Sequence, residues 1–480
     1  MNHSLASFVH AGVVLCVFVF LLFLSLSSLT ESPATWMDEG AINQVAMNLS
    51  EQGIYGYQIA PEHFISAEFL TTGYPVVYPV ALSFLLFGKS LLSARLVMIL
   101  FIFILSIAVF WYSRMFSFDQ SFSYFFPLAS LALIVSFAPL YGHGKNVLGE
   151  VPGLTFFVLS LLALYIFEQK NRAEWIIFLS GILSGLSMAT KPLYVILILP
   201  SSLYIFLLLK RKVFSLKEKS FFIAGMFIPL LWWVVAQSGD NSVLNTFFYG
   251  NPNQTSLVSL VLKNTSLFFT EFPPAYFLGL LFLWWLGVAL KKREGLYISA
   301  AESFALIFSF FNLLSFLTTR GFYRYFFPSE VLALLFLPYA LYSGLRLRLS
   351  STHSLWGVVF MSASLIGVQG YQLFFHSWVA DSHASTRTAV LSRELGALPS
   401  EKSVFFYHVP EAVLFLPHKN YYQYLRFADT VERGTEVLPL LTQGQVDLVL
   451  VDDRFSTSTF PLSYYKEKSH FDKYTLYEKK

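Results

Sequence analysis

Long apolar stretches separated by short polar ones fill most of the chain, and they predict its secondary structure. Eleven of them reach or approach the length of about 20 residues that a helix needs to cross a bilayer. They cover residues 8–29, 90–112, 122–139, 150–168, 174–190, 193–210, 218–237, 274–291, 298–317, 325–344 and 354–373. We therefore expect a mainly α-helical, polytopic membrane bundle of about eleven transmembrane helices.

Two apolar stretches are less simple to interpret. Residues 8–29 have the position of a signal peptide, but the stretch is long, no lysine or arginine precedes it, and no clean cleavage site follows. We expect it to be retained as a helix. Residues 76–88 are too few to span a bilayer and include Pro79, so we expect an interfacial or re-entrant segment there.

Lysine and arginine residues are unevenly divided between the polar loops. One set of alternate short loops carries thirteen of them and the opposite set carries five. Because positive charge favours the cytoplasmic side, the richer set predicts the cytoplasmic face. The N-terminus is then cytoplasmic, and the loop 30–89, with its interfacial helices, faces outward together with loops 140–149, 238–273 and 318–324. The simplest location is the plasma (inner) membrane.

The character of the sequence changes at about residue 380, where charged residues alternate with short apolar runs. Residues 403–407 (SVFFY) and 446–452 (VDLVLVD) are typical of buried parallel strands. Residues 430–441, between them, are compatible with a helix. We therefore expect a transmembrane domain over residues 1–375 and a small extracytoplasmic α/β domain over residues 376–480.

Composition agrees with a membrane protein and excludes several other classes. Of the 480 residues, 55% are hydrophobic and 13% are charged, and the mean hydropathy is +0.59. This is too apolar for one water-soluble core and excludes a disordered chain. The single cysteine, Cys16, excludes a disulfide scaffold. The net charge of +3 is too small to suggest binding to nucleic acid.

Two adjacent acids, Asp38 and Glu39, open an amphipathic segment that is expected to end at Gly53. Its apolar residues recur with helical spacing, which predicts a helix lying along the membrane surface. The acids have two interpretations. In one, Thr35 is the N-cap and Asp38 occupies the third helical position of a capping box. In the other, a carboxylate at the membrane surface acts as a general base.

Three further outward segments carry charge that a lipid environment does not explain. Lys145 and Glu150 flank the start of one apolar run, where they would form an ion pair, or the carboxylate of Glu150 would be favoured by the helix N-terminus. Lys191 lies at a helix junction and could equally be an ordinary interfacial lysine. Arg320 and Arg324 lie among aromatic residues, as snorkelling anchors do, but their forked donors also suit a lipid phosphate.

Acids and cations on one membrane face suit the chemistry of a polyprenyl-phosphate sugar. The lipid tail of such a donor lies in the bilayer, while cations hold its phosphate and stabilise the leaving group. A carboxylate can remove the proton from the acceptor hydroxyl. A transporter or flippase for a lipid-linked sugar is the alternative, although it would place polar groups at the membrane midplane. A membrane scaffold that binds a partner through its outer domain would need none of these charges together.

The order of these motifs resembles the C-type membrane glycosyltransferases, in particular the group of protein O-mannosyltransferases and aminoarabinose lipid A transferases. The matching segments within residues 10–345 include the acidic pair, Thr-Thr-Gly-Tyr-Pro at 71–75, Leu-Gly-Glu-Val-Pro at 148–152 and Arg-Tyr at 324–325. The resemblance implies that sugar is transferred from a polyprenyl-phosphate donor on the outer face, with inversion. Unlike some members, this chain has no lysine in residues 71–79 to contact the phosphate; Lys145 and Lys191 are candidates to replace it.

The resemblance implies Asp38 as the catalytic base. We expect the substrate-binding residues to be Glu39, Lys145, Glu150, Lys191, Arg320, Arg324 and Tyr325. The sequence indicates no cofactor, and it neither indicates nor excludes a divalent metal. The expected partners are a polyprenyl-phosphate sugar, membrane lipids and an acceptor that is a glycolipid, a polysaccharide or a protein.

Overall fold

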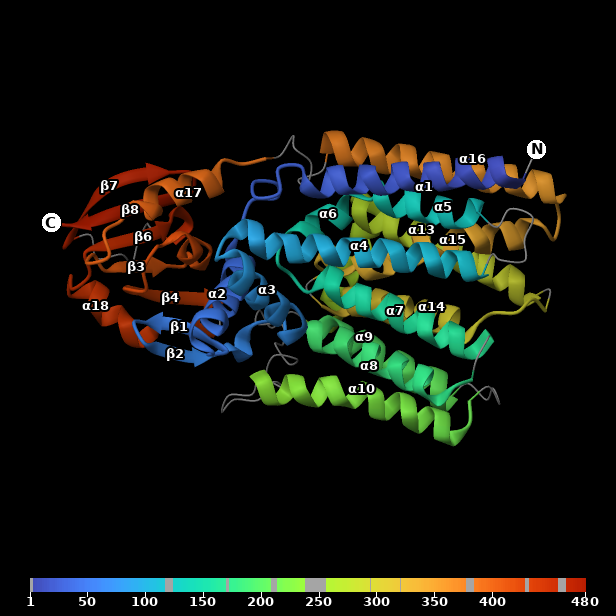
Figure 1. Cartoon of the computed structure of the whole chain (residues 1–480), viewed down its shortest axis with the longest axis horizontal. Helices are drawn as coiled ribbons and strands as arrows, with labels where there is room; N and C mark the ends of the chain where they lie inside the picture. The colour runs from blue at the N-terminus through green and yellow to red at the C-terminus, as the bar shows by residue number, and fades with distance from the viewer. Residues whose placement is uncertain are drawn as a thin grey trace.

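The computed structural model describes residues 3–116, 124–169, 172–208, 214–237, 256–293, 295–319, 321–376, 384–427, 431–455 and 463–480. Most of the chain forms a bundle of roughly parallel and antiparallel helices, and the remainder forms a smaller α/β region at one end (Figure 1). The marked ends of the chain lie at opposite ends of the molecule (Figure 1).

All eleven predicted apolar runs are helical, some with a break. The bundle contains α1 (His3–Leu26), α4 (Leu91–Phe116), α5 (Phe125–Val135), α6 (Ala138–Lys145), α7 (Glu150–Gln169), α8 (Glu174–Thr190), α9 (Pro192–Leu203), α10 (Leu216–Gln237), α13 (Phe272–Arg293), α14 (Ala300–Thr318), α15 (Phe327–Leu345) and α16 (Ser351–Tyr371). Short π-helical segments extend α9 and α16 over Tyr204–Leu208 and Gln372–His376.

Within the described ranges, seven helices are long and apolar enough to cross a membrane, or eight if α5 and α6 form one span bent by 61°. The chain is therefore a multi-pass membrane protein. The predicted number of about eleven is not established, because helices such as α8 and α9 have only 17 and 12 residues.

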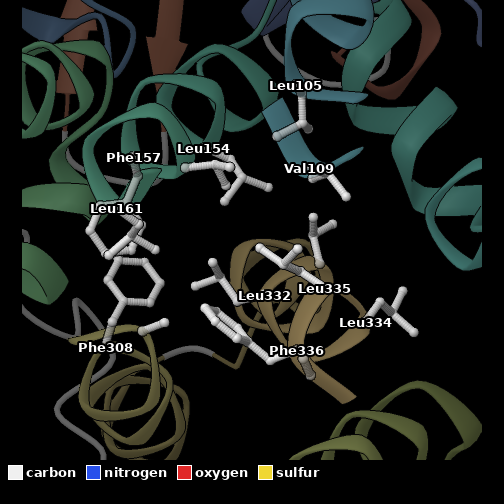
Figure 2. Packing of buried hydrophobic residues seen from close by; sticks show 14 of the residues in the cluster. Leu105, Val109, Leu154, Phe157, Leu161, Phe308, Leu332, Leu334, Leu335 and Phe336 are labelled. Atoms are coloured by element: carbon white, nitrogen blue, oxygen red, sulfur yellow. The ribbon is translucent and has the colours of Figure 1, made fainter. Parts of the chain in front are cut away.

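The core of the bundle consists of aliphatic and aromatic side chains from helices that are distant in the sequence. Figure 2 shows residues of α4, α7, α14 and α15 in this core. Phe157 of α7 stacks on Phe308 of α14 with ring centroids 4.6 Å apart. Between membrane helices such packing is favourable through van der Waals contacts, because the surrounding lipid is as apolar as the side chains themselves. This packing holds the ends of the helices in fixed positions.

Part of the segment 238–273, which was predicted only as an outward-facing loop, is a helix. Helix α12 runs over Leu257–Thr270. The buried amide of Asn264 donates to the carbonyl oxygens of Phe316 and Thr319, at 2.8 Å each. A side chain therefore ties α12 to the end of α14, which hydropathy alone does not reveal.

The predicted loop 30–89 forms a layer between the bundle and the C-terminal region (Figure 1). It contains α2 (Met37–Gln52), the antiparallel strands β1 (Gly56–Ala60) and β2 (His63–Ser66), and α3 (Tyr74–Phe87). Helix α2 ends as predicted at Gly53, whose positive φ of 71° suits glycine. At 14 residues, α3 is too short to span a bilayer upright, as the sequence suggested.

Helix α2 does not lie on a surface with its polar side in water, as the sequence suggested. Its polar residues Glu39, Asn43, Gln44 and Asn48 are buried as fully as its apolar ones. The amide of Gln44 donates to the hydroxyl of Tyr421 at 2.9 Å. The reason is that neighbours cover the helix from both sides: the C-terminal region covers Gln44, and Arg95 of α4 pairs with Glu39.

The C-terminal region is a six-stranded mixed sheet with small helices. Its strands are β3 (Val404–Tyr407), β4 (Tyr421–Phe427), β5 (Val431–Arg433), β6 (Leu448–Asp452), β7 (Tyr465–Phe471) and β8 (Tyr474–Lys479), in the order β5-β4-β3-β6-β8-β7. Its longest helix is α17 (Arg387–Gly396), and a 3₁₀ helix covers Pro410–Phe415. Strands β3 and β6 are the two predicted from sequence, and they pair in parallel.

The helix predicted over residues 430–441 is largely wrong. Residues 431–433 form strand β5, paired antiparallel with β4. Gly434 then turns the chain with φ of 75°, and only a 3₁₀ turn and the five-residue helix α18 (Leu438–Thr442) follow. Thr430 lies outside the described residues. Pairing with β4 is a tertiary interaction that local sequence does not encode.

Candidate active site

Four of the residues singled out in the sequence form one chain of alternating charges at the end of the bundle nearest the C-terminal region. Nη1 of Arg324 lies 3.4 Å from Oδ2 of Asp38, and Nε of Arg324 lies 3.9 Å from Oε1 of Glu150. The ammonium group of Lys191 contacts the same oxygen of Glu150. The order is therefore Asp38, Arg324, Glu150, Lys191, from the most exposed carboxylate to a buried lysine.

Each member comes from the end of a different element. Asp38 is in the first turn of α2, and Glu150 is the first residue of α7. Lys191 joins α8 to α9, and Arg324 occupies a short 3₁₀ helix, Tyr323–Tyr325, between α14 and α15. The bundle therefore assembles the cluster from segments that meet only in the folded protein.

Arg324 lies at the centre of the cluster and is held by aromatic rings. Its guanidinium carbon lies 5.6 Å from the ring centroid of Trp36 and 5.4 Å from that of Tyr325, within the range of cation–π attraction. Burial alone would lower the pKa of Arg324, but Glu150, Tyr325 and Asp38 raise it above its ordinary value. Nε is buried without a hydrogen-bond partner in the part of the chain that the structure describes. The side chain is thus a fixed cation with unused donor capacity.

Asp38 does not cap its helix. The N-cap of α2 is Trp36, which makes no side-chain capping hydrogen bond, so the predicted capping box with Thr35 is wrong. The backbone carbonyl of Thr35 accepts a hydrogen bond of 2.7 Å from Nη1 of Arg387 in the C-terminal region. The side chain of Asp38 is 21% exposed. It is the accessible carboxylate of the charge chain.

Glu150 and Lys191 lie beneath Arg324 and are shielded from water. The side chain of Glu150 is completely buried and that of Lys191 is 4% exposed. The predicted alternative partner of Glu150 was Lys145, but the observed partners are Lys191 and Arg324. A buried carboxylate between two cations holds both of them in place. We therefore expect these two residues to orient Arg324.

Glu39 points away from its neighbour Asp38 and forms a buried ion pair with Arg95 of α4. Its two carboxylate oxygens accept hydrogen bonds of 2.9 and 2.6 Å from Nε and Nη2 of Arg95. The backbone N–H of Val147 adds a third bond of 3.0 Å. Both side chains are completely buried. Because its oxygens are occupied inside the protein, we assign Glu39 a positioning role in place of the predicted substrate contact.

The sequence did not identify Arg95 as part of the site. Its Nη1 also donates to the carbonyl oxygens of Leu29 and Pro33, at 2.7 and 2.8 Å, and so fixes the chain that leads to α2. An arginine inside an apolar run is costly unless it is paired. The position of Arg95 inside an apolar run could therefore have indicated a buried ion pair.

The remaining predicted residues that the structure describes do not belong to the chain of charges. Lys145 is buried, and its ammonium group donates to the carbonyl of Ser27 at 2.7 Å, beyond the end of α1. It therefore holds that segment, and neither cavity described below is lined by it. Tyr325 is half-buried next to Arg324. Arg320 lies outside the described residues.

Two cavities meet at His143 and Arg324, which line both of them. One has a volume of about 510 Å³ and adjoins Trp36 and Asn146 on the side of α2. The other has a volume of about 320 Å³ and is lined by residues of α6, α13, the start of α15 and the end of α16. In the described ranges, no group of three or more His, Cys, Asp and Glu side chains is placed to hold a metal ion. The two spaces together can admit a substrate on either side of one arginine.

Known proteins resemble this chain in part of its sequence and in most of its fold. Residues 75–236 match a family model described as dolichyl-phosphate-mannose-protein mannosyltransferase. ArnT from Cupriavidus metallidurans in the apo state has a TM-score of 0.65 and 13% identity, with 97% of this chain and 98% of that chain covered. The structure of that ArnT bound to undecaprenyl phosphate has the same TM-score and 14% identity, with the same coverage. A comparison with curated proteins found no match.

A second type of enzyme also shares the fold. The oligosaccharyltransferase of Archaeoglobus fulgidus in the apo form has a TM-score of 0.58 and 12% identity, with 93% of this chain and 70% of that chain covered. The resemblance to C-type membrane glycosyltransferases drawn from the sequence is thereby confirmed.

Proposed function

We propose that this chain, a relative of the C-type membrane glycosyltransferases in fold and sequence, transfers a sugar from a polyprenyl-phosphate donor to an acceptor hydroxyl or amide. The reaction inverts the anomeric carbon, and Asp38 is the general base. The acceptor is a glycolipid, a polysaccharide or a protein. The site faces the extracytoplasmic side of the plasma membrane, with the N-terminus in the cytoplasm.

The observation that carries this proposal is the contact between Asp38 and Arg324. A partly exposed carboxylate lies 3.4 Å from a guanidinium that lines two cavities. Glycosyl transfer from a lipid phosphate needs this combination, because a base must take the acceptor proton while a cation stabilises the departing phosphate. Arg324 suits the second task, since its forked donors match two phosphate oxygens.

The proposed reaction proceeds as a single displacement. Asp38 takes the proton of the acceptor as the acceptor atom forms a bond to the anomeric carbon. The bond between that carbon and the phosphate oxygen breaks, and polyprenyl phosphate leaves with its charge next to Arg324. Glu150 and Lys191 hold the guanidinium from below. No second carboxylic acid is needed, because the phosphate leaves as a stable anion.

Inversion sets a geometric condition on the pair. The acceptor atom and the leaving phosphate must lie on opposite faces of the anomeric carbon, so the sugar lies between Asp38 and the phosphate. We therefore expect the 3.4 Å contact between Asp38 and Arg324 to lengthen when donor binds.

Lipid phosphates bound to proteins of this fold support the choice of donor. The ArnT of Cupriavidus metallidurans was determined with undecaprenyl phosphate, and AglB of Archaeoglobus fulgidus with dolichol-phosphate and an inhibitory peptide. The buried chain of charges ends at the outward face that the distribution of lysine and arginine predicts.

The test uses purified full-length protein with polyprenyl-phosphate sugars and candidate acceptors. We expect free polyprenyl phosphate to appear only when a suitable acceptor is present, together with a glycosylated acceptor. A flippase would instead move the intact donor across a vesicle membrane without breaking its glycosidic bond. Transbilayer movement with no bond cleavage for any donor and acceptor pair would overturn the proposal.

A further inference from the structure

The smaller cavity, of about 320 Å³, has the lining of a polar ligand site. Aromatic side chains such as Phe137, Phe272 and Tyr276 make up much of its wall, and Glu330 and Gln369 contribute polar groups. Its volume falls within the range of about 300–1,000 Å³ that is usual for small-molecule sites. Arg324 lies at its boundary with the larger cavity.

Glu330 is the least satisfied polar group of this cavity. It lies in the first turn of α15 and is only 6% exposed. Within the described ranges its carboxylate has no hydrogen bond or ion pair. The nearby Gln369 differs, since it accepts from Ser136 and donates to Tyr276, at 2.7 Å each. A buried carboxyl group without a partner is costly, and the helix N-terminus only partly offsets that cost. A ligand that forms hydrogen bonds with Glu330 would remove this energetic cost.

The chemistry of Glu330 restricts which ligand that is. An isoprenoid tail offers no hydrogen-bond donor, and a phosphate repels a carboxylate. A group rich in hydroxyls or carrying an ammonium satisfies it, and aromatic walls suit the C–H face of a sugar ring. Arg324, at the boundary of the cavity, would hold the phosphate attached to that sugar.

We propose that the 320 Å³ cavity binds the sugar ring of the lipid-linked donor and that Glu330 selects it by accepting hydrogen bonds from a hydroxyl or an ammonium group. This inference rests on the proposed function, and it adds the position of the sugar and a residue that determines specificity.

Binding measurements without acceptor test this inference separately from catalysis. The probes are undecaprenyl phosphate, the same lipid carrying a neutral hexose, and the same lipid carrying an amino sugar. Full-length wild type should bind one of the two glycosylated lipids more tightly than the sugar-free lipid. Glu330→Leu should reduce affinity for that lipid by about tenfold to a hundredfold, as expected for one charge-assisted hydrogen bond. Affinity for undecaprenyl phosphate itself should not change.

Glu330→Gln keeps the size of the side chain and removes its charge, so it separates the two kinds of sugar. For a hydroxyl contact, glutamine should retain much of the affinity; for an ammonium contact, glutamine should lose as much as leucine. Glu174→Gln, at the exposed start of α8 on the opposite end of the bundle, is the matched control and should bind all probes like wild type.

Three outcomes would overturn the inference. One is an equal loss of affinity for undecaprenyl phosphate, which would make the cavity a lipid or phosphate site. Another is a Glu330 variant that binds donors normally but raises only the KM of the acceptor. The third is unchanged binding of every probe by Glu330→Leu with a normal melting temperature. None of these outcomes depends on turnover. The proposed function is therefore tested separately, by the transfer assay.

Discussion

The carboxylate of Asp38 lies 3.4 Å from the guanidinium of Arg324, although the two residues are 286 positions apart in the sequence. Asp38 follows the first helix of the bundle, and Arg324 precedes α15. Behind Arg324, Glu150 and Lys191 continue the chain of charges into the protein. The fold thus brings together a base from near the start of the sequence and a phosphate-binding cation from residue 324.

Arg324→Ala should weaken use of the donor much more than use of the acceptor. Loss of one charge-assisted contact costs about 1.5–3 kcal/mol, or roughly 10- to 150-fold in donor KM or kcat/KM. Arg324→Lys should recover only part of this loss, because lysine keeps the charge without the fork. Steady-state kinetics with varied donor at fixed acceptor measure the effect. Arg348→Ala, an exposed arginine beyond the other end of α15, is the control, and equal kinetics for both alanine variants would count against the role of Arg324.

Arg95→Met should destabilise the protein by about 3–5 kcal/mol, because it leaves the carboxylate of Glu39 buried without its cation. The double variant Glu39→Gln, Arg95→Met should lose less than the sum of the single variants, since both charges are removed together. Thermal unfolding in detergent compares the variants. If Arg95→Met melts like wild type, the pair does not hold the segment before α2.

Gly40→Ala should disrupt the contact between α2 and the C-terminal region. A Cβ at Gly40 would lie 2.3 Å from the Cα of Glu411, a backbone atom that cannot move aside alone. Such overpacking costs about 1–3 kcal/mol, and the shift would move Asp38, two residues away. Gly279→Ala, in α13, has no neighbour within 4 Å and is the matched control. We expect a lower melting temperature and slower transfer for Gly40→Ala only; equal behaviour of the two would exclude a role for the close approach.

Cysteine labelling tests the predicted orientation. After Cys16→Ser, Ser400→Cys in the C-terminal region should react with an impermeant thiol reagent in intact cells, because it is exposed and expected outside. Thr352→Cys, exposed at the start of α16, should react only after permeabilisation. The reverse pattern would mean that the distribution of lysine and arginine misidentifies the cytoplasmic face.

Local patterns in the sequence predicted those features that depend on neighbouring residues. The apolar runs became helices, Gly53 ended α2, and the two β-branched runs became the parallel strands β3 and β6. These features follow from periodicity, backbone freedom and burial of both faces of a strand. The acidic pair was also recognised as the start of a helix.

Contacts between distant segments could not be predicted in the same way. The capping box is absent because α2 begins with Trp36 as its N-cap, and the carbonyl of Thr35 accepts a hydrogen bond from Arg387, far away in the sequence. Asp38 and Glu39 look alike in sequence, but Arg95 buries one of them and leaves the other accessible. Which of the two acids stays accessible is decided by packing.

Arg95 and Glu330 share one sequence feature that indicates a special role. Both are ionisable residues inside apolar runs, at residues 90–112 and 325–344, where a charge is costly unless it is paired or functional. Arg95 is paired with Glu39, whereas Glu330 faces a cavity. The same sequence feature thus marks a structural residue in one helix and a candidate binding residue in another.

The central claim is that Asp38 is the general base, and single-turnover transfer by Asp38→Asn tests it most directly. Asparagine has nearly the same size but cannot take the acceptor proton, so transfer should slow by roughly 10²–10⁴-fold. Donor binding and melting temperature should stay near wild type, because Arg324, Glu150 and Lys191 are unchanged. Asp453→Asn in the C-terminal region is the matched control and should transfer sugar normally. A folded Asp38→Asn protein that transfers sugar at a near-normal rate would contradict the assignment.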